Sequence, residues 1–163
     1  MKAVMPIFYS IFLLTLANGS PVVAKKLFGS RFAFALDGGH LLFDGRPVFG
    51  ASKTVRGVVV SIVVTAVGGI LLGLGYELGA LMAIVAMAGD LFSSFLKRRM
   101  NMPPSSQALG LDQVPESLFP LLACQESLGL SYADIFVVVL MFFVGELAIS
   151  RVLYMLRIRD QPY

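Results

Sequence analysis

Near the end of one apolar run, a carboxylate is followed at helical spacing by polar and basic side chains. Asp90 stands in AGDLFSSFLKRR, and Ser93, Ser94 and Lys97 follow it at spacings of three, four and seven. On a helix these spacings place the side chains on one face. A carboxylate at this depth in a membrane helix is costly and indicates a functional site. The alternative is an interfacial residue that reaches water or pairs with a nearby Lys or Arg.

A second carboxylate opens the next apolar segment. Asp112 lies in LGLDQVPE, on the same side of the predicted membrane as the end of the run that holds Asp90. Mg²⁺ takes few protein carboxylates and completes its shell with water and phosphate oxygens. Two carboxylates entering from one side could therefore share a hard cation that assists chemistry at phosphorus.

The stretch FDGRPVFGASKTVRG, residues 43–57, supplies cations beside these carboxylates. Lys53 and Arg56 follow Gly50 and come just before a predicted membrane helix, so both could contact a polyphosphate. Thr54 is placed to cap that helix, whose N-terminus favours anions. The pattern GxxxxGK[ST] is absent, which argues against an ATP-driven P-loop enzyme.

An alternative interpretation of this loop is a basic segment resting on anionic lipid headgroups. It accounts for Lys25 and Lys26. It does not account for Asp37, Asp44 and Pro47, which are interleaved with the bases.

The elements that must position these residues are membrane helices. The chain has 163 residues, of which 57% are hydrophobic and 14% charged, with a mean hydropathy of +0.83. The chain is therefore more hydrophobic, and carries fewer charged residues, than ordinary soluble domains. We predict an all-α, polytopic integral membrane protein whose residues 1–163 form a single transmembrane domain. The lone Cys124 lies in an apolar run and is expected to be a small buried side chain.

Apolar runs predict about five transmembrane helices. Four are clear: residues 3–24, 57–76, 78–96 and 135–150, the last extendable into VLYML. A fifth, around residues 114–133, contains Glu116, Pro120 and Glu126 and is expected to be short or irregular.

The basic residues predict the orientation. They concentrate in residues 25–56, 97–99 and 151–159. With five spans, the positive-inside rule puts the loops of about 25–56 and 97–112 and the C-terminus in the cytoplasm, and the N-terminus outside. With four spans the last cluster would face the other side. A cleaved signal peptide over residues 1–24 is the rival interpretation, but it would leave six bases of the first loop outside.

Longer motifs add a family resemblance. The order ANGSPVV, LDGGHLLFDGRPVFGASKTVRG, GDLFSSFLKRR and LDQ resembles the CDP-archaeol synthase family, the archaeal CTP-dependent enzymes of ether-lipid synthesis and their bacterial relatives. The resemblance covers about residues 6–150. The second half is also similar to the signature of CDP-diacylglycerol synthases.

The resemblance implies a reaction and its residues. A lipid phosphate attacks the α-phosphorus of CTP with the help of Mg²⁺, giving a CDP-activated lipid and pyrophosphate at the cytoplasmic face of the cell membrane. Nucleic acid is not among the expected partners, and the oligomeric state stays open. The metal ligands implied are Asp90 and Asp112; the catalytic residues are Asp44, Lys53, Arg56, Ser94, Lys97 and Arg98; the substrate-binding residues are Asn18, Gly45, Arg46, Lys53 and Arg56.

One departure bears on the metal. In CDP-diacylglycerol synthases a second Asp follows the last motif Asp by three residues, whereas this chain has Pro115 there and Glu116 next. Either Glu116 substitutes with a shifted geometry, or the second carboxylate is absent and a single Mg²⁺ is bound.

A different class of function stays open beside the enzyme. The chain could be a non-catalytic small transporter or lipid-binding subunit that retains the fold, but its charges concentrate at one membrane face and no internal repeat is present. His40 is expected to be a polar loop residue, because phosphoryl transfer from an ionised phosphate needs no histidine base. Glu146 is expected to have a structural role. Nothing in the apolar spans selects ether or ester, isoprenoid or acyl chains.

Overall fold

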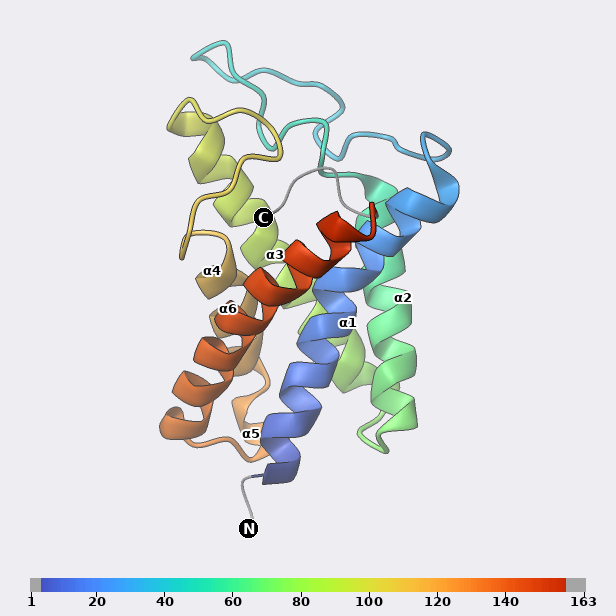
Figure 1. The fold of residues 1–163 in the computed structure, drawn as a ribbon, viewed down its shortest axis with the longest axis vertical. Coiled ribbons are helices and arrows are strands. Elements are labelled where there is room, and N and C mark those ends of the chain that lie inside the picture. Colours follow the sequence, from blue (N-terminus) through green and yellow to red (C-terminus); the bar gives the residue numbers. More distant parts are fainter. Residues whose placement is uncertain (1–3, 158–163) are drawn as a thin grey trace.

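The protein is a bundle of helices joined by two long connections at one end (Figure 1). The computed structural model describes residues 4–157, apart from the side chain of residue 153. Its helices are α1 (Val4–Phe28), α2 (Val55–Leu71), α3 (Tyr76–Arg99), α4 (Gln113–Ala123), α5 (Gln125–Leu128) and α6 (Tyr132–Met155). Within that range the extended structure consists of isolated bridges, such as Ala35 with Thr54. The all-α prediction is confirmed.

The two long connections gather at the same end of the bundle. Residues 29–54 join α1 to α2, and residues 100–112 join α3 to α4. Figure 1 shows both above the ends of α1 and α3, while the hairpin between α2 and α3 and the short α5 lie at the opposite end. We call the end with the two connections the loop face.

Among residues 4–157, three helices are long and apolar enough to cross a membrane. These are α1, α3 and residues 132–152 of α6, while α2 is apolar but has 17 residues. The fifth predicted segment is irregular, as expected. Helix α4 ends at Ala123, and α5 has only four residues before Gly129 closes it in a left-handed conformation, with φ of 65°. The multi-pass, all-helical character of the prediction is confirmed.

The backbone carbonyl that the proline of the first helix leaves free has a partner on α2. Pro21 lies within α1 and has no N–H to donate to the carbonyl of Ala17. Ser61 of α2 donates its hydroxyl to that carbonyl at 2.7 Å. Freed backbone groups at membrane depth need such partners. Proline and serine therefore attach α2 to the middle of α1.

Glycine allows α2 and α3 to pack closely. A Cβ on Gly79 would lie 2.9 Å from Ala66 Cα, and a Cβ on Gly69 would lie 3.2 Å from Gly79 Cα. Small residues permit this approach in membrane helices, where packing rather than water drives association.

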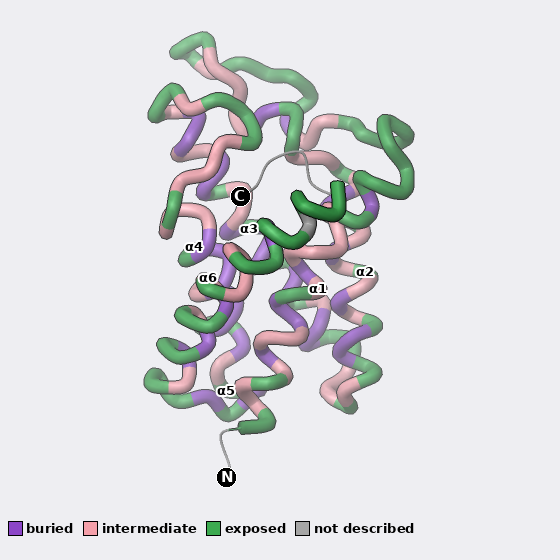
Figure 2. Tube along the Cα trace, in the orientation of Figure 1, coloured by how far each residue is buried: buried purple, intermediate pink, exposed green. Residues whose placement is uncertain are grey.

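The core lies where α1, α3, α4 and α6 meet. Its fully buried side chains include Leu13, Met82, Leu121 and Val138. Cys124 is fully buried among them, which confirms the expectation for this residue. Figure 2 shows the buried positions on the inner sides of the helices and exposed positions along the outer sides of α2 and α6. Many of the outer side chains are large and apolar, as expected for helices that face lipid.

Candidate active site at the loop face

Asp90 is held by a lysine from the first long connection. Lys53 Nζ lies 2.5 Å from each carboxylate oxygen of Asp90. Both side chains are about four-fifths shielded from solvent. Burial opposes the charge on Lys53, but the surrounding carboxylates, of which Asp90 contributes most, together outweigh it and raise the pKa of the lysine above its ordinary value. The pair therefore joins the start of α2 to α3 through opposite charges.

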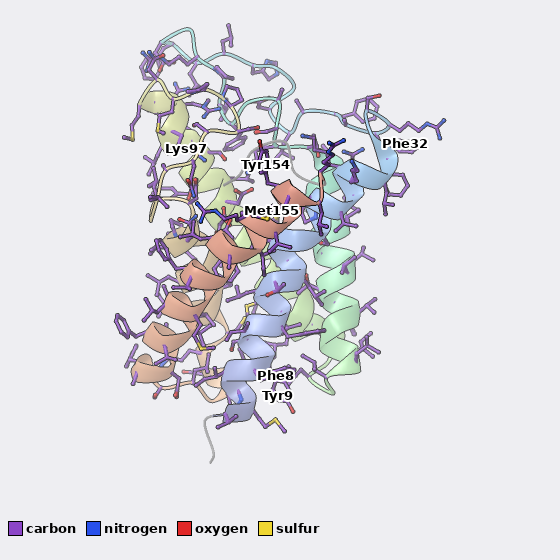
Figure 3. The ribbon with its side chains drawn as sticks, in the orientation of Figure 1. Phe8, Tyr9, Phe32, Lys97, Tyr154 and Met155 are labelled. Carbon is purple, nitrogen blue, oxygen red and sulfur yellow. The ribbon has the colours of Figure 1, made fainter. Side chains whose placement is uncertain are left out.

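A second pair joins α3 to the start of α4. Lys97 Nζ lies 2.5 Å from Asp112 Oδ1, and it also donates to the carbonyl of Ser106 at 2.9 Å. The other oxygen of Asp112 accepts the backbone N–H of Ala108 at 2.9 Å. Figure 3 labels Lys97 on α3, near the loop face. The second long connection is thus folded back against the helix that carries Asp90.

The two pairs form one cluster with a third carboxylate. Lys53 also interacts electrostatically with Asp112 of the other pair. Asp90 likewise interacts electrostatically with Lys97. Glu116 of α4 is only 7% exposed, and its carboxyl group contacts that of Asp90. Among residues 4–157, however, no three His, Cys, Asp or Glu side chains converge closely enough to form a preformed metal cage. The lysines lie between the carboxylates instead.

One face of α3 determines how closely α4 approaches. A Cβ added to Gly89 would meet the carbonyl oxygen of Pro115 and would lie 2.6 Å from its carbonyl carbon. One turn on, Ser93 donates its hydroxyl to the carbonyl of Leu111 at 2.6 Å. Lys97 follows at the same spacing. This stripe of Gly, Ser and Lys holds the chain from residue 106 to Glu116 against α3.

Asp37 organises the first long connection. Its Oδ2 accepts the backbone N–H groups of Phe49 and Gly50 at 2.9 and 2.8 Å, and its Oδ1 accepts that of Gly39 at 3.1 Å. Burial acts against ionisation, but these donors outweigh it and hold the pKa of Asp37 below its usual value. Asp37 was not among the predicted site residues. The sequence Asp-Gly-Gly, which begins at Asp37, is the signal that could have indicated a turn.

The tip of the same connection is attached to the end of α3. Arg99 Nη1 contacts Asp44 Oδ1 at 2.6 Å, and Arg99 Nη2 donates to the carbonyl of Pro47 at 2.6 Å. Arg46 in turn donates to the carbonyl of Arg99 at 2.6 Å. Gly45, with φ of 72°, forms the turn between Asp44 and Arg46. Predicted residues 44–46 therefore lie at the loop face, attached by an arginine that the prediction omitted.

A shallow hollow opens beside these arginines. It measures about 300 Å³ and is lined by Arg46, Pro47, Arg98 and residues 101–104. Arg98 is buried and donates Nη2 to the carbonyl of Pro103 at 2.7 Å, while its Nε has no hydrogen-bond partner in the described part of the chain. Gly50 lies against its guanidinium, since a Cβ there would be 3.3 Å from Arg98 Nη1.

Other predicted residues lie outside the charge cluster. Arg56 donates Nη1 to the carbonyls of Gly29 and Arg31 at 2.9 and 2.5 Å. Asn18 donates to the carbonyl of Leu14 in its own helix at 3.1 Å. Ser94 is buried on α3, one turn beyond Asp90. Roles for these residues stay predictions.

Two further expectations concern single residues. Thr54 caps α2 by accepting the N–H of Gly57 at 3.1 Å, as predicted. His40 lines an open hollow of the first connection beside Asp37.

The fold is that of an enzyme embedded in the membrane. A solved structure described as an intramembrane enzyme for archaeal membrane lipids biosynthesis superposes with a TM-score of 0.67 at 28% identity, covering 84% of this chain and 90% of that one. The sequence model described as "CarS-like: CDP-archaeol synthase" matches residues 3–163.

Individual relatives carry the same description. CDP-archaeol synthase of Pyrobaculum calidifontis is 32% identical over the whole of both chains. That of Pyrococcus furiosus is 37% identical over 123 residues, 69% of this chain and 70% of that one. The chain belongs to the CDP-archaeol synthase family. The predicted family and the nucleotidyltransferase class are confirmed.

Proposed function

We propose that this protein transfers CMP from CTP to a lipid phosphate at the loop face. An oxygen of the lipid phosphate forms a bond to the α-phosphorus of CTP, the bond from that phosphorus to the bridging oxygen breaks, and pyrophosphate leaves. The observation that carries the proposal is the shielded cluster of two lysine–aspartate pairs, Lys53 with Asp90 and Lys97 with Asp112, at the end where both long connections gather.

The donor set of the cluster fits Mg²⁺. Asp90, Asp112 and buried Glu116 offer hard carboxylate oxygens, which Mg²⁺ prefers. The position of Glu116 beside Asp90 favours the interpretation in which it takes the place of the second Asp of the CDP-diacylglycerol synthases. Bound Mg²⁺ would neutralise charge on the polyphosphate as pyrophosphate leaves. We assign Asp90 and Asp112 as its ligands, with Glu116 beside them.

The lysines have a second task in this scheme. Each now neutralises a carboxylate at 2.5 Å. A cation on those carboxylates would release both ammonium groups to bind phosphate oxygens. Transfer to phosphorus depends mainly on positioning and on neutralising charge, so two lysines that can exchange partners suit the reaction. Arg46 and Arg98, which line the neighbouring hollow, are placed to bind the rest of the polyphosphate.

We propose that the chain crosses the membrane five times, with the loop face in the cytoplasm. The helices alternate in direction, so α1, α3 and α6 end toward the loop face and α2 and α4 begin near it (Figure 1). The short α2, and α4 with α5, serve as the remaining crossings. The N-terminus then lies outside, and CTP reaches the cluster from the cytoplasm.

The lipid is proposed to be a glycerol phosphate with two long chains. The named relatives are CDP-archaeol synthases, which favours an archaeal-type ether lipid; a phosphatidate-like ester lipid is the other candidate. A hydrophobic groove discriminates by only about 1 to 3 kcal/mol per methylene, so apolar walls alone do not settle the choice.

The test is turnover of radiolabelled CTP by purified protein with Mg²⁺ and a panel of ether and ester lipid phosphates. Asp90→Asn and Asp112→Asn should each abolish CDP-lipid formation. Glu126→Gln, which removes an exposed carboxylate from α5 at the opposite end, is the matched control and should retain it. No product with any lipid, together with no CTP binding, would refute the proposal.

A further inference from the structure

Outside the charge cluster, the first turn after α1 carries unusually exposed aromatic side chains. We define the aromatic turn as residues 28–34, FGSRFAF. Phe32 is 68% exposed and Phe34 71% exposed, and Leu27 just before the turn is exposed as well. Exposed apolar groups gathered in this way indicate a surface that contacts something other than water.

The aromatic turn is held rigidly in this position. Arg56 donates to the carbonyls of Gly29 and Arg31, and the N–H of Val55 donates to the carbonyl of Phe34 at 3.0 Å. Phe32 adopts φ of 57°, a left-handed conformation that is strained for a bulky side chain. Such strain persists only where surrounding contacts impose it. The first turn of α2 therefore fixes the aromatic turn with its side chains outward.

The height of the turn matches the edge of the membrane. It follows directly on α1, a candidate spanning helix, and is bonded to the first residues of α2. Figure 3 shows Phe32 at the outer edge of the bundle, pointing away from the helices, whereas the rest of the connection rises above them. A lipid headgroup layer would begin at this level.

The positive charge around the aromatic turn indicates what this surface contacts. Residues 25–36 contain basic side chains and no acidic one. Lys26 donates to the carbonyl of Arg157, a neutral partner, at 2.8 Å, and Arg31 lies exposed between the phenylalanines. Aromatic side chains next to bases are the composition of segments that lie in an anionic membrane interface.

We propose that the aromatic turn is embedded in the anionic headgroup layer of the leaflet at the loop face, with Phe32 and Phe34 toward the acyl chains and Arg31 on lipid phosphates. The inference does not depend on the proposed reaction. Embedding the turn would hold the connection that carries Lys53 close to the surface from which a lipid substrate must enter.

The chain offers a clean spectroscopic test, because it contains no tryptophan. Phe32→Trp places a single indole in the turn. Phe136→Trp, at a 70% exposed position of α6, is the control inside the membrane, and Phe43→Trp, at a 98% exposed position of the connection, is the control in water. Each variant is reconstituted into nanodiscs at one copy per disc, with brominated or ordinary phospholipid.

The proposal expects a tryptophan at position 32 to behave like the one at position 136. Brominated lipid should quench it, aqueous iodide should not, and its emission should be shifted to the blue relative to position 43. Arg31→Gln should lower the ratio of embedded to exposed aromatic turn by about fivefold, because one basic side chain near the anionic surface is lost. Replacing the anionic lipid by a zwitterionic one should lower the same ratio by about fivefold for each basic side chain that loses its attraction to the surface. Arg31→Gln changes only the side chain, so the backbone carbonyl that accepts the hydrogen bond from Arg56 is retained.

Two results would overturn the proposal. One is a tryptophan at position 32 that iodide quenches as fully as the one at position 43. The other is protection that appears only when a disc holds two copies, because the aromatic turn would then be a contact between protein molecules. CTP turnover of the same variants is measured separately, so an inactive protein with an embedded turn would count against the proposed function alone.

Discussion

Gly89 is the residue at which the geometry of the site can be tested most directly. In Gly89→Ala the added methyl group would meet the Pro115 carbonyl oxygen and would lie 2.6 Å from its carbon and 2.9 Å from Glu116 N. These neighbours are backbone atoms, which cannot rotate away as the end of a side chain can. The first turn of α4 must therefore move away from α3.

The size of the movement follows from ordinary contact distances. Cβ atoms normally lie 3.4 Å or more from such neighbours, so α4 must shift by about 1 Å, which is enough to cost roughly 100-fold in rate when reacting groups are misplaced. Glu116 would withdraw from Asp90 by a similar distance. Overpacking of this kind also costs about 1 to 3 kcal/mol of stability.

The assay compares kcat and KM for CDP-lipid formation in Gly89→Ala and Gly145→Ala. Gly145 lies within α6 and has open space around its Cβ position, so alanine there should keep activity and stabilise the helix by about 0.5 to 1 kcal/mol. We expect Gly89→Ala to lose kcat at a temperature where thermal unfolding shows it to be folded. Folded Gly89→Ala with wild-type kcat would refute the argument that α4 must lie this close.

Further predictions follow from other contacts. Lys53→Met should tighten Mg²⁺ binding while lowering turnover, because the lysine and the cation compete for Asp90; weaker binding by calorimetry would contradict this. EDTA should abolish turnover, and Mg²⁺ should restore it. Since the pKa of Asp37 is lowered in the folded protein, its stabilising effect should be complete above the unfolded value of about 3.9 and disappear as pH falls through the folded value; in Asp37→Asn this loss should be missing from acid-unfolding curves. Ser61→Ala should cost about 1 kcal/mol in detergent unfolding, because Ala17 loses its partner; an unchanged midpoint would show that another donor takes over.

The sequence by itself determined most of the framework. Apolar runs located α1, α2, α3 and α6 to within a few residues, because crossing a membrane demands a continuous apolar stretch that any short window reveals. Pro120 and the flanking glutamates indicated an irregular fifth segment, and the structure breaks it at Cys124. The cap at Thr54 was likewise predictable, since a helix cap depends on only a few consecutive residues.

Only the tertiary structure decided which charges meet. Lys53 and Asp90 are 37 residues apart, and no local pattern shows that they pair while Arg56 turns toward Gly29 instead. The contact of Glu116 with Asp90 depends on the packing of α4 against Gly89. Hydropathy, caps and turns are local properties of a chain, whereas the partner of a charge is chosen by where distant helices pack, and that depends on the whole bundle at once.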